Sequence, residues 1–405
     1  MRGAISKLAP PRIRPVLVVL HRVVGLLIAA FLMVAGLTGS VIAFYDEFDA
    51  FVAPELHYVE PAGRTLLDPL VAIRNLERAH PRVQVSFVPL VVEEGRTIRV
   101  FAKEQGELFI DPYDGAIVGR RPSRDLSQGR IAIVPWLHRL HYSLHLGKNG
   151  TLLLGFAALL WVFDCFVGAA LTFPASRKRL RPPEWLQRWR RVFGVDSSRW
   201  AALGFTGHRA VGLWMWGLLL VFALSGTILN LRATSNAVLD ATLGLTERPP
   251  TLSSPPAAPA LTREQAVERA GKQLAEAAME GGFSAERLVG IRYTRGRWIL
   301  YANSDRDVTW ERGQTRAYVD DQTGELVAVQ TPYDKPGDLV RATLLALHMG
   351  EVGGWPYRLL VSVLGLGVAW LSLSGVWIWW RRRSRRTSPR STPGRTHRSQ
   401  RRPGT

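Results

Sequence analysis

Four long apolar runs constrain this chain more than any other feature of its sequence. They cover residues 16–45, 151–173, 212–231 and 357–380. A helix needs roughly 20 apolar residues to cross the ~30 Å hydrocarbon core of a bilayer. We therefore expect a membrane protein with four transmembrane helices, at 16–45, 151–174, 208–231 and 356–380. The first run is too long for the core of a cleavable signal peptide, so we expect it to stay as an anchor.

The positive charge of the chain is concentrated beside these runs. The net charge is +19, whereas residues 1–22, 175–207 and 381–405 together carry +21. Because Lys and Arg favour the cytoplasmic side, the termini (1–15 and 381–405) and the loop 175–207 should be cytoplasmic, and the Arg-rich tail should lie on anionic lipid. This distribution argues against nucleic-acid binding. The single cysteine, Cys165, lies in the second run, so the chain can form no intramolecular disulfide.

A short motif occurs twice, which indicates a tandem duplication. His-Arg-x-x-Gly-Leu begins at His21 and again at His208, and the Gly39 of Leu-Thr-Gly recurs as the Gly226 of Leu-Ser-Gly. Both displacements are 187 residues. The same spacing at both ends of an apolar run is hard to obtain by chance. Each half should therefore begin with a membrane helix that carries one histidine near its start.

Two external segments, 46–150 and 232–355, show the same order of elements. In the first, Asp68 before Pro69 predicts a helix N-terminus, and residues 83–87, 97–102 and 107–110 alternate as strands. In the second, a Pro-rich linker at 248–260 precedes the capping-box pattern of residues 262–265, and strands are expected at 288–293, 298–303 and 315–319. Each segment should be a small α+β module.

These modules resemble PepSY modules, and the whole chain resembles the PepSY-associated transmembrane family. The resemblance rests on the closing strand and turn at 109–115 and 318–324, the repeated His-Arg-x-x-Gly-Leu, and Leu-His before the second and fourth runs. It implies a multi-pass protein of the bacterial inner membrane, with periplasmic modules and a role in iron uptake. The expected fold class is an α-helical bundle of four transmembrane helices with two periplasmic α+β modules.

His21 and His208 occupy equivalent places at the cytoplasmic ends of the first and third helices. Ionisable residues inside a membrane are functional candidates. Two facing imidazoles suit axial ligation of a haem iron, and Arg22 and Arg209 could pair with its propionates. Gly25 and Gly212, one turn further on, would leave room for the porphyrin. The alternative is that both His-Arg pairs merely anchor their helices to headgroups.

The histidines near the other membrane face leave more than one assignment open. His138, His141 and His145 have the i, i+3, i+7 spacing of one helix face. Gapless matching of the apolar runs pairs His141 with His348, whereas matching Gly147 with Gly350 pairs His145 with His348. The first pairing is our prediction and His145 is its competitor. The triplet that includes His138 could instead bind zinc or a ferric ion. These histidines precede their spans by enough residues to lie above the membrane unless nearby glycines break the helix.

The paired histidines predict a transmembrane electron carrier with two b-type haems. The family resemblance implies that this carrier is an oxidoreductase that reduces ferric iron held by a siderophore. No nucleotide-binding motif is present, so electrons should come from quinol or a separate cytoplasmic reductase. One alternative is a membrane-tethered PepSY binding or regulatory protein without redox activity. Another is a periplasmic metal-binding transport accessory. Asp164, which has no acidic counterpart in the other half, should face the bundle, where it could handle protons or make a structural bond.

Overall fold

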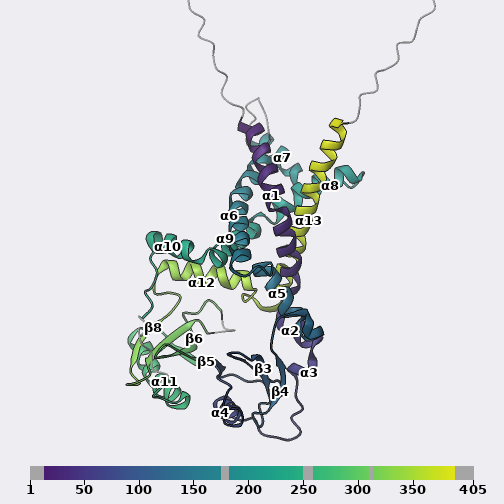
Figure 1. Cartoon of the computed structure of the whole chain (residues 1–405). Coiled ribbons are helices and arrows are strands. Elements are labelled where there is room, and N and C mark those ends of the chain that lie inside the picture. The colour runs from purple at the N-terminus through teal and green to yellow at the C-terminus, as the bar shows by residue number, and fades with distance from the viewer. Residues whose placement is uncertain (1–12, 175–181, 250–258, 310–312, 388–405) are drawn as a thin grey trace, which may run out of the picture.

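The structure is a computed structural model that describes residues 13–174, 182–249, 259–309 and 313–387. Long helices form a bundle at one end and two antiparallel sheets lie at the other, with two helices, α10 and α12, between them (Figure 1). We call the end of the bundle that faces the sheets the module end. The Pro-rich linker, the start of the chain and most of the Arg-rich tail lie outside the described residues.

Three helices of the described chain are long and apolar enough to cross a membrane: α1 (Ile13–Ile42), α6 (Gly147–Thr172) and α13 (Gly354–Thr387). The third span, expected as one continuous helix over 208–231, is instead a pair. Helices α8 (Trp200–Trp214) and α9 (Trp216–Asn230) meet at 71° and count as a fourth span only if taken together. The backbone breaks at Met215, whose sulfur lies against Gly367 of α13. The apolar composition of this segment predicts a membrane span, but it does not predict the bend at Met215.

The helices pack in crossed pairs, α1 along α13 and α6 along α9. Gly36 and Gly365 allow the closest approach of the first pair. A Cβ on Gly36 would meet the Gly365 carbonyl oxygen at 2.6 Å, and a Cβ on Gly365 would meet that of Gly36 at 2.5 Å. Small residues at membrane helix interfaces let backbones touch in this way.

Shorter helices join these elements. They are α2 (Tyr45–Val52), α3 (Pro54–His57), α4 (Pro69–Ala79), η1 (Leu126–Ala132), α5 (Ile133–Ser143), α7 (Pro182–Arg190), η2 (Arg191–Phe193), α10 (Arg232–Leu243), α11 (Arg263–Glu280) and α12 (Pro336–Met349). Arg14 joins the ends of α1 and α6 by donating to the carbonyl oxygens of Leu171 and Phe173. Helix α7 carries the Trp-rich part of the basic loop.

In the described residues, eight strands form two sheets. They are β1 (Phe87–Pro89), β2 (Ile98–Ala102), β3 (Gly106–Ile110), β4 (Ile117–Arg121), β5 (Ala285–Thr294), β6 (Arg297–Ser304), β7 (Thr315–Asp320) and β8 (Leu326–Gln330). The order in one sheet is β2-β3-β4 and in the other β1-β5-β6-β7-β8. Strand β1 belongs to the first module in the chain, but it pairs with β5 of the second, so the modules share a sheet.

The two modules also share one hydrophobic core. Leu76 and Ile110 of the first module belong to the same buried cluster as Leu274 and Leu300 of the second. Ion pairs cross the boundary as well, from Arg263 to Glu77 at 2.6 Å and from Arg74 to Glu264 at 2.7 Å. Because the buried fraction of the surface rises with size, one shared core buries more than two small separate ones would.

Both predicted helix caps are confirmed. The Asp68 side chain accepts from the amide of Leu70 at the start of α4. Thr262 and Gln265 form a capping box at the start of α11. Such caps satisfy amides that the first helical turn leaves without partners.

Candidate functional site

Four histidines lie in two pairs. The inner pair consists of His21 on α1 and His208 on α8, with ring centroids 6.2 Å apart and ring planes at 64°. The outer pair consists of His141 on α5 and His348 on α12, with centroids also 6.2 Å apart and planes at 57°. Each pair takes one histidine from each half of the chain.

Glycines turn the chain back so that the outer pair reaches the bundle. Helix α5 ends at Ser143, and beyond it Leu144, His145 and Gly147 have positive φ. Helix α12 ends at Met349, followed by Gly350 with φ +75° and by Gly353 and Gly354, also with positive φ. L-residues with side chains adopt this conformation at a cost, which explains the glycines. The two breaks let His141 lie beside α1 and His348 beside α9.

The inner histidines are held through Nδ1. His21 Nδ1 lies 2.8 Å from Asp164 Oδ1 of α6. His208 Nδ1 lies 2.9 Å from Ser374 Oγ of α13. Asp164 thus makes a bond to a neighbouring helix, and it is the only carboxylate that contacts a paired histidine among the residues described.

The outer histidines are held in the same manner. His141 Nδ1 lies 3.0 Å from the Ala35 carbonyl oxygen and 3.1 Å from Thr38 Oγ1, both on α1. His348 Nδ1 lies 2.8 Å from Ser225 Oγ on α9. Thr38 and Ser225 are the middle residues of the repeated Leu-Thr-Gly and Leu-Ser-Gly. The repeat therefore marks these two hydroxyls as well as the duplication.

The partners fix which ring nitrogen carries the proton. The Ala35 carbonyl and the Asp164 carboxylate can only accept. The hydroxyls of Ser225 and Ser374 donate to carbonyl oxygens of their own helices, so each must accept from its histidine. Nδ1 is therefore the donor in all four rings, which in a neutral imidazole leaves the lone pair on Nε2. Histidine ligands of metals are held in this way, through the nitrogen that does not bind the metal.

Burial keeps the outer imidazoles neutral. It lowers the pKa of His141 to about 3, with His348 and His138 acting in the same direction. It also lowers the pKa of His348 to about 4. The neutral imidazole is the form that binds a metal.

Glycines pack against the inner rings. A Cβ at Gly168 would lie 3.5 Å from His21 Cε1, and one at Gly375 would lie 3.4 Å from His208 Cε1. The glycines that we expected to leave room, Gly25 and Gly212, have no foreign atom nearer to such a Cβ than 3.9 and 3.6 Å respectively. Space beside the inner pair therefore depends on several small residues.

The separation of the rings can accommodate a metal between them. A metal–imidazole nitrogen bond is about 2.0–2.1 Å, and the nitrogen lies about 1.1 Å from the ring centre, so a shared metal requires centroids roughly 6 Å apart. Among the residues described, no group of three or more His, Cys, Asp or Glu could hold a metal ion. Two histidines without a third protein ligand suit a metal that brings its own equatorial ligands.

The other two histidines of the predicted triplet do not join the outer pair. His145 lies beyond the end of α5, so it does not continue the helix face of His138 and His141. Its ring lies on Trp136, with centroids 4.6 Å apart, and its buried Nε2 has no hydrogen-bond partner. The His138 ring contacts Tyr45 and Tyr142.

The two arginines beside the inner pair differ in environment. Arg22 is exposed. Arg209 is half-buried, lies over the Phe205 ring at 5.8 Å, and its buried Nε lacks a hydrogen-bond partner. A cation with an unsatisfied donor can bind an anionic group.

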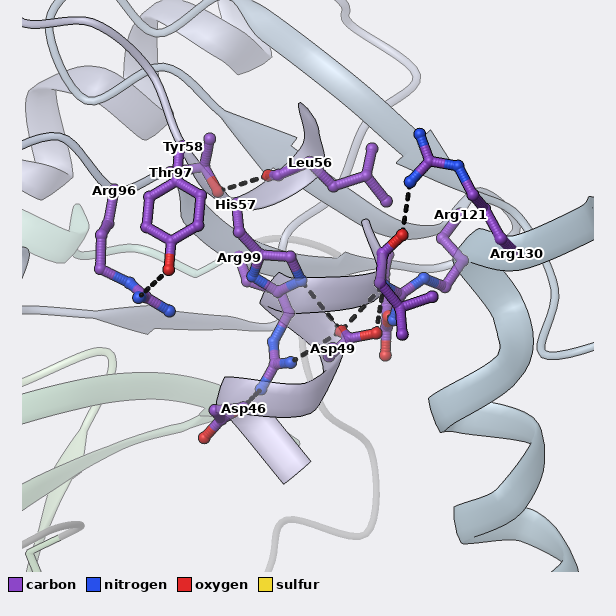
Figure 2. Close-up of polar contacts among 12 residues, drawn as sticks. Asp46, Asp49, Leu56, His57, Tyr58, Arg96, Thr97, Arg99, Arg121 and Arg130 are labelled. Carbon is purple, nitrogen blue, oxygen red and sulfur yellow. Dashed lines mark hydrogen bonds and ion pairs between the residues drawn. The ribbon is translucent and has the colours of Figure 1, made fainter. Parts of the chain in front are cut away.

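A separate buried polar network lies in the first module (Figure 2). Arg121 donates to both oxygens of Asp49, at 3.0 and 2.9 Å, and to Glu107 at 2.9 Å, while His57 Nε2 lies 3.0 Å from Asp49. Burial alone would raise the pKa of Asp49, but hydrogen bonds from His57 and Arg121 outweigh it and lower that pKa. The network joins α2 and α3 to the three-stranded sheet, and we assign it a structural role.

The apolar helices and the α+β modules define a membrane protein with an extramembrane domain. The family model described as the PepSY-associated TM region matches residues 18–382. The chain belongs to this family, as the sequence resemblance predicted. No curated protein matches the chain at a significant level of similarity.

Proposed function

We propose that this protein is a transmembrane electron carrier that binds two b-type haems and reduces ferric iron held by a siderophore. The observation that carries the proposal is that four histidines lie in two facing pairs and are held through Nδ1, so that Nε2 is left to bind a metal. Bis-histidine ligation suits electron transfer because the iron needs no open position. The bent helices α8 and α9 count as one span in this proposal, which gives four spans.

The contacts around the histidines support a duplication. His21 packs on Gly168 as His208 packs on Gly375, and Thr38 contacts His141 as Ser225 contacts His348. His21 and His208, like Thr38 and Ser225, are related by the displacement of 187 residues. Gly168 and Gly375, like His141 and His348, are related by the gapless match of the second and fourth apolar runs. Two copies of one half, packed about a pseudo-twofold axis, would place equivalent histidines opposite each other at both ends of the bundle.

The residues of the chain hold and orient each group. The inner pair would bind one haem and the outer pair the other, with Arg22 and Arg209 placed for the inner propionates. A bound haem supplies a one-electron ferric/ferrous couple. The Nδ1 partners hold the imidazoles in the ligating tautomer, and the apolar helices exclude water from between the pairs.

The orientation follows from the basic segments. With the termini in the cytoplasm of a bacterium, the inner pair would face a quinol or cytoplasmic reductase and the outer pair the periplasm. The ferric substrate would accept one electron at the outer pair and leave as Fe(II), for which hard oxygen donors have less affinity. Inner-membrane location and iron uptake rest on the family resemblance.

Haem stoichiometry is the first test. We expect the detergent-purified chain to show a sharp b-type band on reduction and two haems per chain in a pyridine haemochrome assay. His208→Ala and His348→Ala should each lower the count to one, because each removes one ligand of a different pair. His138→Ala, on the same helix as His141, is the matched control and should retain two.

A colourless protein after haem-supplemented expression would contradict the proposal. A tethered PepSY binding protein would then be the better account, because such a protein requires no haem. If haem binds but electrons from the reduced protein do not reach a ferric siderophore, the electron-carrier assignment stands and the substrate assignment is wrong.

A further inference from the structure

A large cavity lies where the bundle meets the five-stranded sheet. Its volume is about 820 Å³, within the range of pockets that hold small organic ligands. Strands β1, β5, β6 and β7 form one wall, and α9, α10 and α12 form the other. Apolar side chains such as Phe87, Val289 and Leu345 share the lining with polar ones.

Cations dominate the charge of this cavity. Six arginines from four secondary-structure elements and one loop line it: Arg232, Arg248, Arg287, Arg292, Arg316 and Arg341. The acidic lining residues are Asp338 and Glu351. Asp338 lies 2.6 Å from Arg341 and also accepts from the Thr246 amide. Within the described part of the chain, no carboxylate lies within ion-pair distance of the other five arginines.

Two of the arginines are held in place by aromatic rings. Arg316 lies over the Tyr301 ring at 5.9 Å, and Arg292 lies over the Phe87 ring at 5.6 Å. The buried Nε of Arg316 has no hydrogen-bond partner, and neither has the buried Oδ1 of Asn236 on the opposite wall. Stacking orients a guanidinium group so that its remaining donors can meet an anion.

The arginines are close enough to repel one another. Burial lowers the pKa of Arg341, and the charges of Arg248, Arg316 and Arg232 act in the same direction, while Asp338 opposes them. Bringing like charges together costs free energy that a bound anion would recover. Arginines spread over a flat, fully solvated surface would repel one another less.

The cavity extends to the outer histidine pair. Ser225, whose hydroxyl accepts from His348 Nδ1, is one of its lining residues. A ligand that fills the cavity would therefore lie one side chain away from His348.

We propose that this cavity binds an anionic metal chelate through its arginines. The proposal rests on the proposed function in one respect, namely that the bound metal is the ferric iron to be reduced. A ferric ion held by catecholate or carboxylate groups keeps a net negative charge, whereas a ferric trihydroxamate centre is neutral. The cavity therefore selects the anionic class of siderophore. A free phosphate would fill only a small part of the volume.

Gallium(III) chelates separate binding from reduction, because gallium has the charge of ferric iron but is not reduced under these conditions. The full-length protein in zwitterionic-lipid nanodiscs is titrated with a gallium tris-catecholate and with a gallium trihydroxamate. We expect the anionic chelate to bind more tightly, and its affinity to fall as ionic strength shortens the Debye length from about 10 Å at 0.1 M to about 3 Å at 1 M. Arg316→Gln and Arg292→Gln should each weaken binding by about tenfold, since each removes a charge-assisted hydrogen bond.

Controls keep the test independent of folding and of haem. Arg120→Gln alters an exposed arginine of the first module and should leave binding unchanged; Arg316→Lys keeps the charge and should recover part of the affinity. Equal binding of the two chelates, or no effect of the cavity variants, would overturn the proposal. Anionic-lipid nanodiscs form a further arm: if the cavity prefers lipid headgroups to the chelate, chelate binding will be lost in the anionic membrane, and the proposal is also overturned. Tight gallium binding by a protein without haem would refute the electron-carrier function and leave the cavity assignment intact.

Discussion

Asp164 should set a difference in reduction potential between the two ends of the protein. Of the five Nδ1 partners, Asp164 alone is a carboxylate; the others are three hydroxyls and a backbone carbonyl. A negative partner makes an imidazole a stronger electron donor and so favours the ferric state of the bound iron. A haem held by the inner pair should therefore have the lower reduction potential, which favours electron flow from the inner pair toward the outer pair. Asp164→Asn should raise the inner potential.

The size of this shift follows from the hydrogen bond. The 2.8 Å contact is charge-assisted, and such bonds are roughly twice as strong as neutral ones, which contribute about 1 kcal/mol. Replacing the charge-assisted hydrogen bond by a neutral one therefore changes the free-energy difference between the ferric and ferrous states by about 1 kcal/mol. For a one-electron couple, about 1.4 kcal/mol corresponds to about 59 mV, so the expected rise is about 40 mV. Asn preserves the volume and a carbonyl acceptor, so the ring should remain in place.

Spectroelectrochemical titration of the wild type and the variant measures both potentials. Ser374→Ala is the matched control, because it removes the neutral partner of the other inner histidine and should shift the inner potential by less. Thr38→Val should act on the outer couple only. An unchanged inner potential in Asp164→Asn, or a shift confined to the outer couple, would refute the reasoning.

Four further predictions concern the site and the packing around it. Arg121→Met should destabilise the protein by about 3–5 kcal/mol in thermal or denaturant unfolding, because it removes the buried cation that pairs with both Asp49 and Glu107. Asp49 has a lowered folded pKa, so its contribution is present above its unfolded pKa of about 3.9 and is lost as the pH falls through the folded value; stability measured from pH 7 down to pH 3 should fall, and less steeply in Asp49→Asn. His141→Ala should release one haem per chain while His145→Ala retains two, and the opposite result would make His145 the outer ligand. Gly365→Leu should prevent the close packing of α1 on α13 and lower the yield of folded protein in size-exclusion chromatography, whereas wild-type elution would show that the helices can separate without loss.

Much of the fold was predictable because membrane spans and caps are local signals. Apolar length identified α1, α6 and α13, and short motifs placed the starts of α4 and α11. The pairing of β1 with β5 was not predictable in this way. A strand of three residues carries little information about its partner, and its pairing depends on how the modules pack.

The site residues that belong to the repeated motif were predictable from the sequence. The repeat marked His21 and His208 directly, and the structure brings their rings together. For the outer histidines, spacing alone left His141 and His145 open, because a helix over the whole segment would have kept both on one face. The positive φ at Leu144 and His145 ends that helix and separates them. The Arg-lined cavity left no sequence pattern, since its walls come from residues between 87 and 351 in the chain.

The crossed packing of the bundle explains why neither half could complete the site alone. Helix α1 packs along α13 and α6 along α9, so the helices of one half lie against those of the other. His21 has its Nδ1 partner within its own half, on α6, and so do His208, His141 and His348 in theirs. Each half thus orients its own histidines, but the ring that faces each of them comes from the other half. Orientation is a property of the repeat unit, whereas a complete two-histidine site requires the two halves to associate.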